Sequence, residues 1–217
     1  MSIFLLWSLA LNYSEDSEME RSKQLRDVFD RTDGMISFEE AVLLYRLAKK
    51  ARNGCILEIG SYRGRSTVFL GKGSLDGAGV PVFAVDPHTS FVGILGGVFG
   101  SRDRTAFYEA MLLHNCSEIV SLINLSSEAF SSQWSCAISL LWIDGDHRYE
   151  GVRRDFDCWE RYLLPGSFIA FDDALDSSLG PLKVIEELIG SGSYLPVARV
   201  GKIVVLCRAN NESLPEE

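Results

Sequence analysis

The sequence has 217 residues, of which 47% are hydrophobic and 24% charged, and its formal net charge is −9. The apolar content excludes a wholly disordered chain, and the length suits one large domain with its own core. An anionic surface repels phosphate backbones, so we expect no nucleic-acid partner. We also expect no membrane span, because the longest apolar runs are about half the ~20 residues that a spanning helix needs.

Five cysteines stand far apart in the chain: Cys55, Cys116, Cys136, Cys158 and Cys207. Their number is odd, and no CxxC pair or Cys/His cluster occurs. This pattern predicts free thiols in a reducing compartment, hence a cytoplasmic protein, and argues against a structural zinc site.

The N-terminal region begins with an apolar segment at residues 3–11. No basic segment precedes it and no small-x-small cleavage site follows, so a signal peptide is disfavoured. We interpret residues 1–35 as an arm that docks on the body or joins two subunits in a homo-oligomer, with the acidic stretch 15–20 as a mobile lead-in. Residues 36–210 are expected to form one domain, and residues 211–217 a flexible tail.

Helix and strand signals alternate along the expected domain. Ser37 and Glu40 form a capping-box pattern, and the helix that it predicts ends at Gly54. The predicted strands are 55–59, 80–85, 119–123, 137–143 and 168–171. The predicted helices after them are 66–72, 105–114, 128–132, 149–163 (ended by Pro165-Gly166) and 182–189. Residues 195–200 and 203–207 flank Gly201-Lys202 and predict an antiparallel hairpin.

Continuous apolar strands joined by helices indicate a parallel sheet that is covered on both faces. The predicted fold class is therefore α/β, doubly wound. Ligands of such sheets bind beyond the carboxyl ends of the strands, at the point where the strand order reverses. The residues that follow each strand are the ones to inspect for function.

The first strand runs into Glu58-Ile-Gly60-Ser-Tyr-Arg-Gly64-Arg-Ser66. Its two glycines permit a sharp turn and close approach of a ligand, and the helix after it directs N–H groups at the same place. The spacing differs from the GxGxxG of a dinucleotide loop. Asp86 closes the second strand, where an acidic residue accepts ribose hydroxyls. The alternatives are a tight turn without a ligand and a turn-capping Asp86.

Carboxylates gather after the fourth and fifth strands, at Asp144, Asp146, Asp172 and Asp173, together with His147. Crowded carboxylates favour a positive partner, and Mg²⁺ prefers such oxygen ligands. His147 has a side chain suited to taking a proton from a substrate hydroxyl. The alternatives stay open: the aspartates could cap a helix and pair with arginine without a metal, and His147 could be structural.

Three segments carry a resemblance to a known family: LEIGSYRGRST, VFAVDPH and LLWIDGDHRYEGVRRDFDCWERYLLPGSFIAFDD. Together with the closing hairpin they resemble class I S-adenosylmethionine-dependent methyltransferases, and more narrowly the small-molecule O-methyltransferase group of macrocin O-methyltransferase and cephalosporin hydroxylase-like proteins. The resemblance covers residues 54–208. It implies a Rossmann-like, mostly parallel seven-stranded sheet with an antiparallel last strand.

The resemblance also implies a set of site residues. Those implied or predicted to hold S-adenosylmethionine are Glu58, Gly60, Ser61, Gly64, Ser66, Asp86, His88, Ser126, Ser127, Glu128, Asp144, Gly145 and His147. In metal-dependent relatives the positions of Asp144, Asp172 and Asp173 bind Mg²⁺, and the position of His147 carries the general base. Two departures weaken the match, since Leu125 stands where glycine is common and His88 where an aromatic residue is usual.

The resemblance predicts O-methylation of a small hydroxylated metabolite, such as a sugar, a catechol or a natural product, with catalytic roles for Asp144 and His147 and with magnesium assistance left open. A non-catalytic S-adenosylmethionine-binding protein and a nucleotide-dependent oxidoreductase are the alternatives. The glycine-rich loop 92–100 suits either a lid over the substrate or a contact with another subunit.

Overall fold

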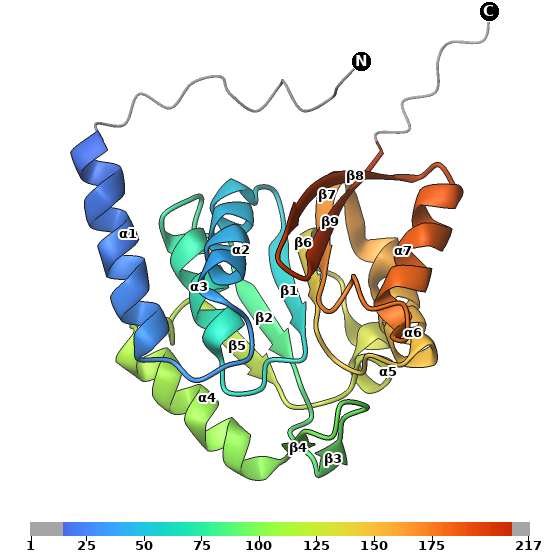
Figure 1. The fold of residues 1–217 in the computed structure, drawn as a ribbon, viewed down its shortest axis with the longest axis horizontal. Helices are drawn as coiled ribbons and strands as arrows, with labels where there is room; N and C mark the ends of the chain where they lie inside the picture. The colour runs from blue at the N-terminus through green and yellow to red at the C-terminus, as the bar shows by residue number, and fades with distance from the viewer. Residues whose placement is uncertain (1–14, 210–217) are drawn as a thin grey trace, which may run out of the picture.

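The computed structural model describes residues 15–209, with side chains from Met19 onward. A seven-stranded sheet in the order β5-β2-β1-β6-β7-β9-β8 forms its centre (Figure 1). β9 runs antiparallel to both neighbours, and the other pairs are parallel. The strands of this sheet are β1 (Cys55–Ile59), β2 (Val82–Val85), β5 (Val120–Ile123), β6 (Ile138–Ile143), β7 (Leu163–Phe171), β8 (Tyr194–Val200) and β9 (Ile203–Arg208). The doubly wound fold and its antiparallel last strand are confirmed.

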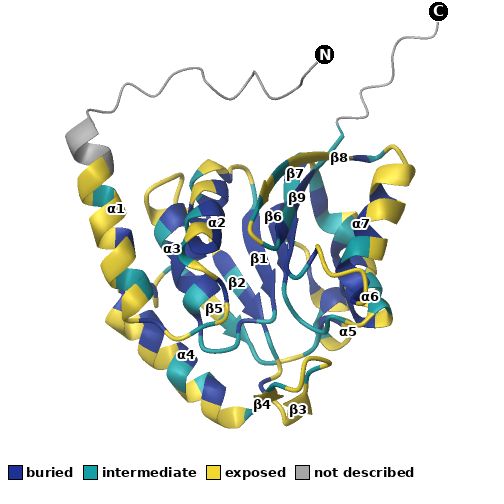
Figure 2. Ribbon diagram, viewed as in Figure 1, coloured by how far each residue is buried: buried dark blue, intermediate teal, exposed yellow. Residues whose placement is uncertain are grey.

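Helices cover both faces of the sheet (Figure 1). They are α1 (Glu15–Asp30), α2 (Phe38–Lys50), α3 (Arg65–Leu75), α4 (Ser101–Leu113), α5 (Ser127–Phe130), α6 (Tyr149–Trp159) and α7 (Gly180–Gly190), with short 3-10 turns η2 (Ser131–Gln133) and η3 (Glu160–Tyr162). Along β6, Leu140 and Trp142 pack under α2 and α3, whereas Leu141 and Ile143 pack under α6 and α7. Because both faces are buried (Figure 2), the strand is apolar except for Ser139.

The strand order reverses between β1 and β6, which lie side by side at the centre of the sheet. From β1 the chain winds outward to β2 and β5, and it then returns to β6 and winds the other way. The loops after β1 and β6 therefore diverge to opposite faces and leave a crevice between them, as expected for a ligand site in this kind of sheet.

Most predicted elements are confirmed, including the capping box, in which the Ser37 backbone N–H donates to Glu40 and the Glu40 N–H donates to Ser37. The predicted helix 149–163 was too long, because α6 ends at Trp159 and η3 leads straight into β7. Pro165 lies inside β7 and does not end a helix. The strand tolerates Pro165 because its pairing register with β6 shifts between Leu163 and Phe168. At such an irregularity the proline, which has no backbone N–H, does not need to donate a hydrogen bond to the neighbouring strand.

The acidic stretch at residues 15–20 was predicted to be a mobile lead-in, and this prediction was wrong. It forms the first turns of α1, which docks on the body through buried Leu25 and through Arg21, whose guanidinium pairs with Asp76. Tyr45 donates a second hydrogen bond to Asp76. The apolar segment 3–11 and the predicted tail 211–217 lie outside the described residues.

The glycine-rich loop forms a small antiparallel hairpin of β3 (Phe91–Val92) and β4 (Val98–Phe99), closed by a hydrogen bond from the Gly93 N–H to the Gly97 carbonyl. Ile94 and Leu95 at its tip are exposed. The five cysteines are free thiols. None of the helices within residues 15–209 has the length and apolar content to cross a bilayer.

Candidate functional site

A cavity of about 660 Å³ opens at the carboxyl ends of the central strands, within the usual size range of small-molecule sites. Its wall combines the loops after β1, β2, β5, β6 and β7 with the β3–β4 hairpin and residues 34–36. The predicted site residues that line it are Gly60, Ser61, Ser66, Asp86, His88, Ser126, Ser127, Asp144, Gly145, His147, Asp172 and Asp173. Three others, Glu58, Gly64 and Glu128, do not line it.

Gly60 lies where the loops after β1 and β6 touch. Its φ is +82°, and a Cβ added there would lie 2.7 Å from the Asp144 carbonyl carbon and 2.9 Å from Gly145 Cα. The Asp144 N–H donates to the Ile59 carbonyl at 2.8 Å. Only glycine permits this contact, which fixes the two sides of the crevice relative to each other.

Glu58 lies below the cavity floor and is fully buried. The hydroxyls of Ser66 and Thr67, in the first turn of α3, both donate to its carboxylate. Burial raises the pKa of Glu58 to about 7, against the opposing effect of these two hydrogen bonds. Glu58 therefore anchors the start of α3, whose first residues, Arg65 and Ser66, line the cavity.

Asp86 joins the end of β2 to the glycine loop. One of its carboxylate oxygens accepts from the N–H groups of Ser61 and Tyr62 at 2.9 and 3.1 Å, and the other accepts from the His88 N–H at 2.8 Å. His88 Nε2 lies 2.8 Å from the Tyr62 carbonyl and must donate to it, while His88 Nδ1 is buried and has no hydrogen-bond partner within residues 15–209. Asp86 thus orders the loop, and its oxygens and His88 Nδ1 retain acceptor capacity for a ligand's hydroxyls.

The loop after β5 and the facing turn of α6 form the far end of the cavity. The Ser126 hydroxyl caps α5 by accepting from the Ala129 N–H, and Glu128 points away to lie 3.5 Å from Arg154. Asp155 lines the cavity and is buried, and this burial raises its pKa to about 6. Asp155 was not among the predicted site residues, although an acidic residue on the apolar face of α6 was a usable signal.

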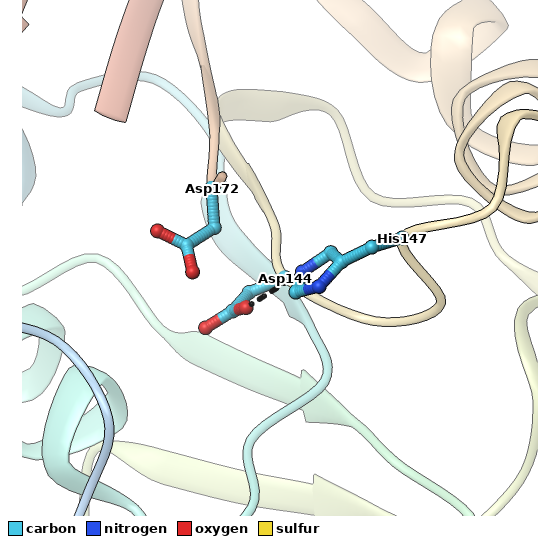
Figure 3. Close-up of side chains that lie close together, drawn as sticks. All are labelled: Asp144, His147 and Asp172. Carbon is cyan, nitrogen blue, oxygen red and sulfur yellow. Dashed lines mark hydrogen bonds and ion pairs between the residues drawn. The ribbon is translucent and has the colours of Figure 1, made fainter. Parts of the chain in front are cut away.

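The imidazole of His147 lies between two carboxylates. Its Nε2 is 3.3 Å from Asp144 Oδ1 and its Nδ1 is 3.2 Å from Asp173 Oδ2. Asp172 lies beside Asp144, and Figure 3 shows these two carboxylates and the imidazole converging from the ends of β6 and β7. The parallel pairing of β6 with β7 brings them together, because Ile143 and Phe171 are register partners.

The charged groups of this cluster alter one another's protonation. Burial raises the pKa of Asp144, and burial together with the neighbouring Asp144 charge raises the pKa of Asp172 to about 8. Burial lowers the pKa of His147, but the carboxylates of Asp144, Asp173 and Asp172 outweigh it and the net shift is upward. The cluster therefore holds protons more tightly than isolated side chains do.

Lys202, in the turn between β8 and β9, is a residue that the sequence analysis placed only in a hairpin turn. Its Nζ lies 2.7 Å from Asp172 Oδ2 and 2.9 Å from Asp173 Oδ1, and its side chain lines the cavity. No local sequence signal places it there, because its position depends on β9 inserting between β7 and β8.

These contacts do not fit the predicted magnesium site of Asp144, Asp172 and Asp173. Among the described residues, the set of three acidic or imidazole groups that could share one metal ion, with all ligand atoms within 4.8 Å of one another, is Asp144, His147 and Asp172, and it leaves out Asp173. Both oxygens of Asp173 face cations or imidazole, one at Lys202 and one at His147. An ammonium thus occupies the space between two of the three predicted ligands.

Solved structures of similar shape come from several organisms. The SAH-bound methyltransferase PaMTH1 of Podospora anserina has a TM-score of 0.63 at 16% identity, covering 94% of this chain and 99% of that chain. TomG, a SAM-bound O-methyltransferase of Streptomyces achromogenes involved in tomaymycin synthesis, has a TM-score of 0.61 at 16% identity, covering 92% and 93%. Cofactor-bound Rv0187 from MTB scores 0.62 at 16% identity, covering 91% and 92%. At these identities the likeness is one of fold.

A curated relative, protein R132 of Acanthamoeba polyphaga mimivirus, is 34% identical over 64 residues, which is 27% of this chain and 29% of that protein. The chain thus matches under a third of the relative's length. Residues 57–174, more than half of the chain, match the model of a family described as a methyltransferase domain. This span begins in β1, ends just after β7 and includes the cavity loops that follow those strands. The resemblance to class I methyltransferases is therefore confirmed, and the chain belongs to the methyltransferase-domain family.

Proposed function

We propose that this chain is an S-adenosylmethionine-dependent O-methyltransferase acting on a small hydroxylated metabolite. The observation that carries this proposal is the placement of His147. Its imidazole is held between Asp144 and Asp173 on the wall of a cavity that also contains the glycine loop. A proton acceptor beside a cofactor loop is what methylation of a hydroxyl requires.

The cofactor side of the cavity suits S-adenosylmethionine in its donor set. The N–H groups at the start of α3 suit the carboxylate of the methionine portion. Asp86 and His88 Nδ1 suit the two ribose hydroxyls, and the buried Asp155 suits the amino group of adenine. When bound, the cofactor supplies an electrophilic methyl group on its sulfonium sulfur.

His147 acts as the general base through Nε2. Asp173 Oδ2 lies 3.2 Å from Nδ1, so its carboxylate favours a proton on that nitrogen and leaves Nε2 as the basic one, as the aspartate does in a hydrolytic triad. As the acceptor oxygen attacks the methyl group, its proton passes to Nε2, and the Asp144 carboxylate stabilises the imidazolium that forms. The remaining contribution of the protein is to align the two reactants and to exclude water.

The β3–β4 hairpin supplies an apolar and aromatic wall to the cavity. Phe99 packs edge-on against Tyr62, with ring centroids 5.3 Å apart, and Phe91 lies 6.0 Å from Phe99. This wall favours an acceptor that carries an apolar or aromatic surface beside its hydroxyl, within the range of sugars, catechols and natural products. The hairpin is also in position to cover a bound acceptor.

The deciding experiment is calorimetric titration of the protein with S-adenosylhomocysteine, followed by a screen for transfer of an isotopically labelled methyl group to hydroxylated acceptors. We expect micromolar binding, and transfer that is lost in His147→Ala. Binding with no transfer to any acceptor would favour a non-catalytic cofactor-binding protein. No binding by folded protein, with fluorescence-detected binding of NADH, would favour a nucleotide-dependent oxidoreductase.

A further inference from the structure

The Lys202 ammonium is fixed in place before any ligand binds. The Lys202 N–H donates to Glu40 Oε1 at 2.8 Å, and the Lys202 carbonyl accepts from the Ala174 N–H at 2.9 Å. Glu40 is buried in α2, and its other oxygen accepts from the Ser37 N–H. The turn that carries Lys202 is thus hydrogen-bonded on one side to α2 and on the other to the segment after β7.

Gly201 allows the turn that carries Lys202 to lie directly against the Glu40 carboxylate. Its φ is +53°, and a Cβ added there would overlap the Glu40 carboxylate, with Glu40 Cδ only 2.9 Å away. The glycine lets the backbone approach Glu40 directly and turn the next side chain toward the cavity. The backbone of Lys202 therefore has a defined position, from which its side chain reaches the cavity.

The surroundings of Lys202 are those of a cation site. Asp172 and Asp173 each direct one oxygen at its Nζ, and Asp144 and His147 lie next to them. The second oxygen of Asp172 is buried and has no hydrogen-bond partner among the described residues, so the cluster has unused acceptor capacity. A divalent ion bound by these groups would compete with the ammonium for the same oxygens and would be repelled by its charge.

We propose that the Lys202 ammonium is the built-in cation of this site, that it replaces a divalent metal there, and that it holds the acceptor oxygen during methyl transfer. This inference rests on the proposed O-methyltransferase function. It adds a role for Lys202 and the expectation that methyl transfer needs no divalent metal. Burial lowers the pKa of Lys202, but the carboxylates of Asp172, Asp173 and Asp144 outweigh this effect, and the net upward shift favours the charged ammonium.

The resulting step is balanced without a metal. The acceptor O–H bond breaks and its proton moves to His147 Nε2, an O–CH₃ bond forms, and the S–CH₃ bond breaks with its electron pair left on sulfur. Lys202 donates a hydrogen bond to the oxygen as negative charge develops on it. Two of the three ammonium N–H groups face Asp172 and Asp173, which leaves one for the acceptor oxygen. A metal can chelate two acceptor oxygens, whereas this single N–H binds one, so the site does not require a vicinal diol.

The test compares Mn²⁺ binding, followed by electron paramagnetic resonance of free Mn²⁺, in the wild type and in Lys202→Met, Lys202→Arg and Lys183→Met. Lys183 is an exposed lysine of α7 and provides a matched control. We expect no saturable binding in the wild type, Lys202→Arg or Lys183→Met. We expect Lys202→Met to gain one Mn²⁺ site, with affinity at least about tenfold above any weak binding by the wild type, because the carboxylates of Asp172 and Asp173 lose the ammonium that contacts them.

Stoichiometric Mn²⁺ binding by the wild type would overturn the inference, and so would a folded Lys202→Met that gains none. Circular dichroism reports folding, and if Lys202→Met does not fold, the wild type and Lys202→Arg still decide the question. Parallel calorimetry with S-adenosylhomocysteine separates this inference from the function on which it rests. Cofactor binding together with wild-type Mn²⁺ binding removes the role of Lys202 alone, whereas absent cofactor binding removes the proposed function.

Discussion

The two sides of the cavity present different kinds of polar group. On the side of β1 and β2, the polar contacts are mainly backbone N–H groups, and Asp86 orders them by accepting from Ser61, Tyr62 and His88. On the side of β6 and β7, the polar groups are ionisable side chains, with three aspartates around His147 and Lys202. One side is fixed by main-chain hydrogen bonds and the other by a balance of charges.

This difference separates two tasks. Backbone N–H groups have no protonation equilibrium in the physiological range, so the hydrogen bonds that they donate to a ligand on the first side do not themselves change with pH. The charged side responds to protons, because the pKa values of Asp144, Asp172 and His147 are all shifted upward. We therefore expect binding of the cofactor and turnover of the acceptor to fail independently, and substitutions on both sides of the cavity test the contacts behind this expectation.

The largest effect is expected from His147→Asn. Methyl transfer should fall by about 10²–10⁴-fold, the usual contribution of a general base, while S-adenosylhomocysteine affinity should change by less than about tenfold. In the wild type the base works only when unprotonated, so kcat/KM should rise with pH through a midpoint above 6.5, the ordinary histidine value. A midpoint below that value, or loss of cofactor binding in the variant, would contradict the division of tasks.

Gly60→Ala should damage both sides at once, because Gly60 is where they touch. Its Cβ would meet the backbone of Asp144 and Gly145, and the residue would hold a φ of +82°. We expect a loss of about 2–4 kcal/mol in the free energy of unfolding, measured by denaturant titration. Gly190→Ala is the control, since no atom lies within 4 Å of its added Cβ. Equal effects of the two substitutions would show that the contact is unimportant.

Glu58→Gln should change how stability depends on pH. The pKa of Glu58 rises from 4.5 to about 7 on burial, so the folded state holds a proton that the unfolded state releases. This proton stabilises the fold at low pH, and its contribution is lost as pH rises from about 5 to about 7. Relative to the variant, the wild type should therefore lose up to about 3 kcal/mol between pH 5 and pH 8.

The free energy of unfolding of the wild type and of Glu58→Gln is measured by urea titration at about pH 5 and about pH 8. Glu186→Gln, at an exposed position in α7, should show the same pH dependence as the wild type. A Glu58→Gln curve parallel to the wild-type curve would mean that Glu58 is not titrating between these pH values.

The smallest effect is expected from Glu128→Ala. The Glu128 carboxylate forms an exposed ion pair with Arg154 and does not line the cavity. S-adenosylhomocysteine affinity should change by less than about twofold, and stability by less than about 1 kcal/mol. The contrasting substitution is Asp155→Asn on α6, which should weaken binding by about tenfold if Asp155 accepts from adenine. Calorimetric titration of both variants with S-adenosylhomocysteine compares the two effects. A larger loss of affinity in Glu128→Ala than in Asp155→Asn would contradict the prediction.

The sheet could be predicted because its central strands, β1 and β6, are buried on both faces and are apolar except for Glu58 and Ser139. The end of α6 could not, because it depends on the pairing of Leu163 with Ile138, a contact between distant residues. The same shift in register allows Pro165 inside β7, against its local meaning as a breaker. Local signals therefore located the elements, and pairing decided where α6 ends.

The site could be predicted where its residues follow parallel strands, as Asp144, His147, Asp172 and Asp173 do. Lys202 arrives from an antiparallel turn, and its place is set by Glu40 in α2, which is 162 residues away along the chain. Glu58 was placed in the cavity by its motif, but its side chain lies beneath the loop and bonds to α3. A motif specifies neighbours in sequence and does not specify on which side of the backbone a side chain lies.

Arg65 has a consequence for the segment that precedes α2. Its guanidinium donates to the carbonyls of Thr32, Gly34 and Ile36, and it lies over the Phe29 ring of α1. Residues 34–36 form part of the cavity wall. Arg65 therefore contacts both α1 and a segment that a bound ligand would touch. By linkage, a ligand that presses on this wall should slow hydrogen exchange in α1. A helix remote from the chemistry would then report whether the cavity is filled.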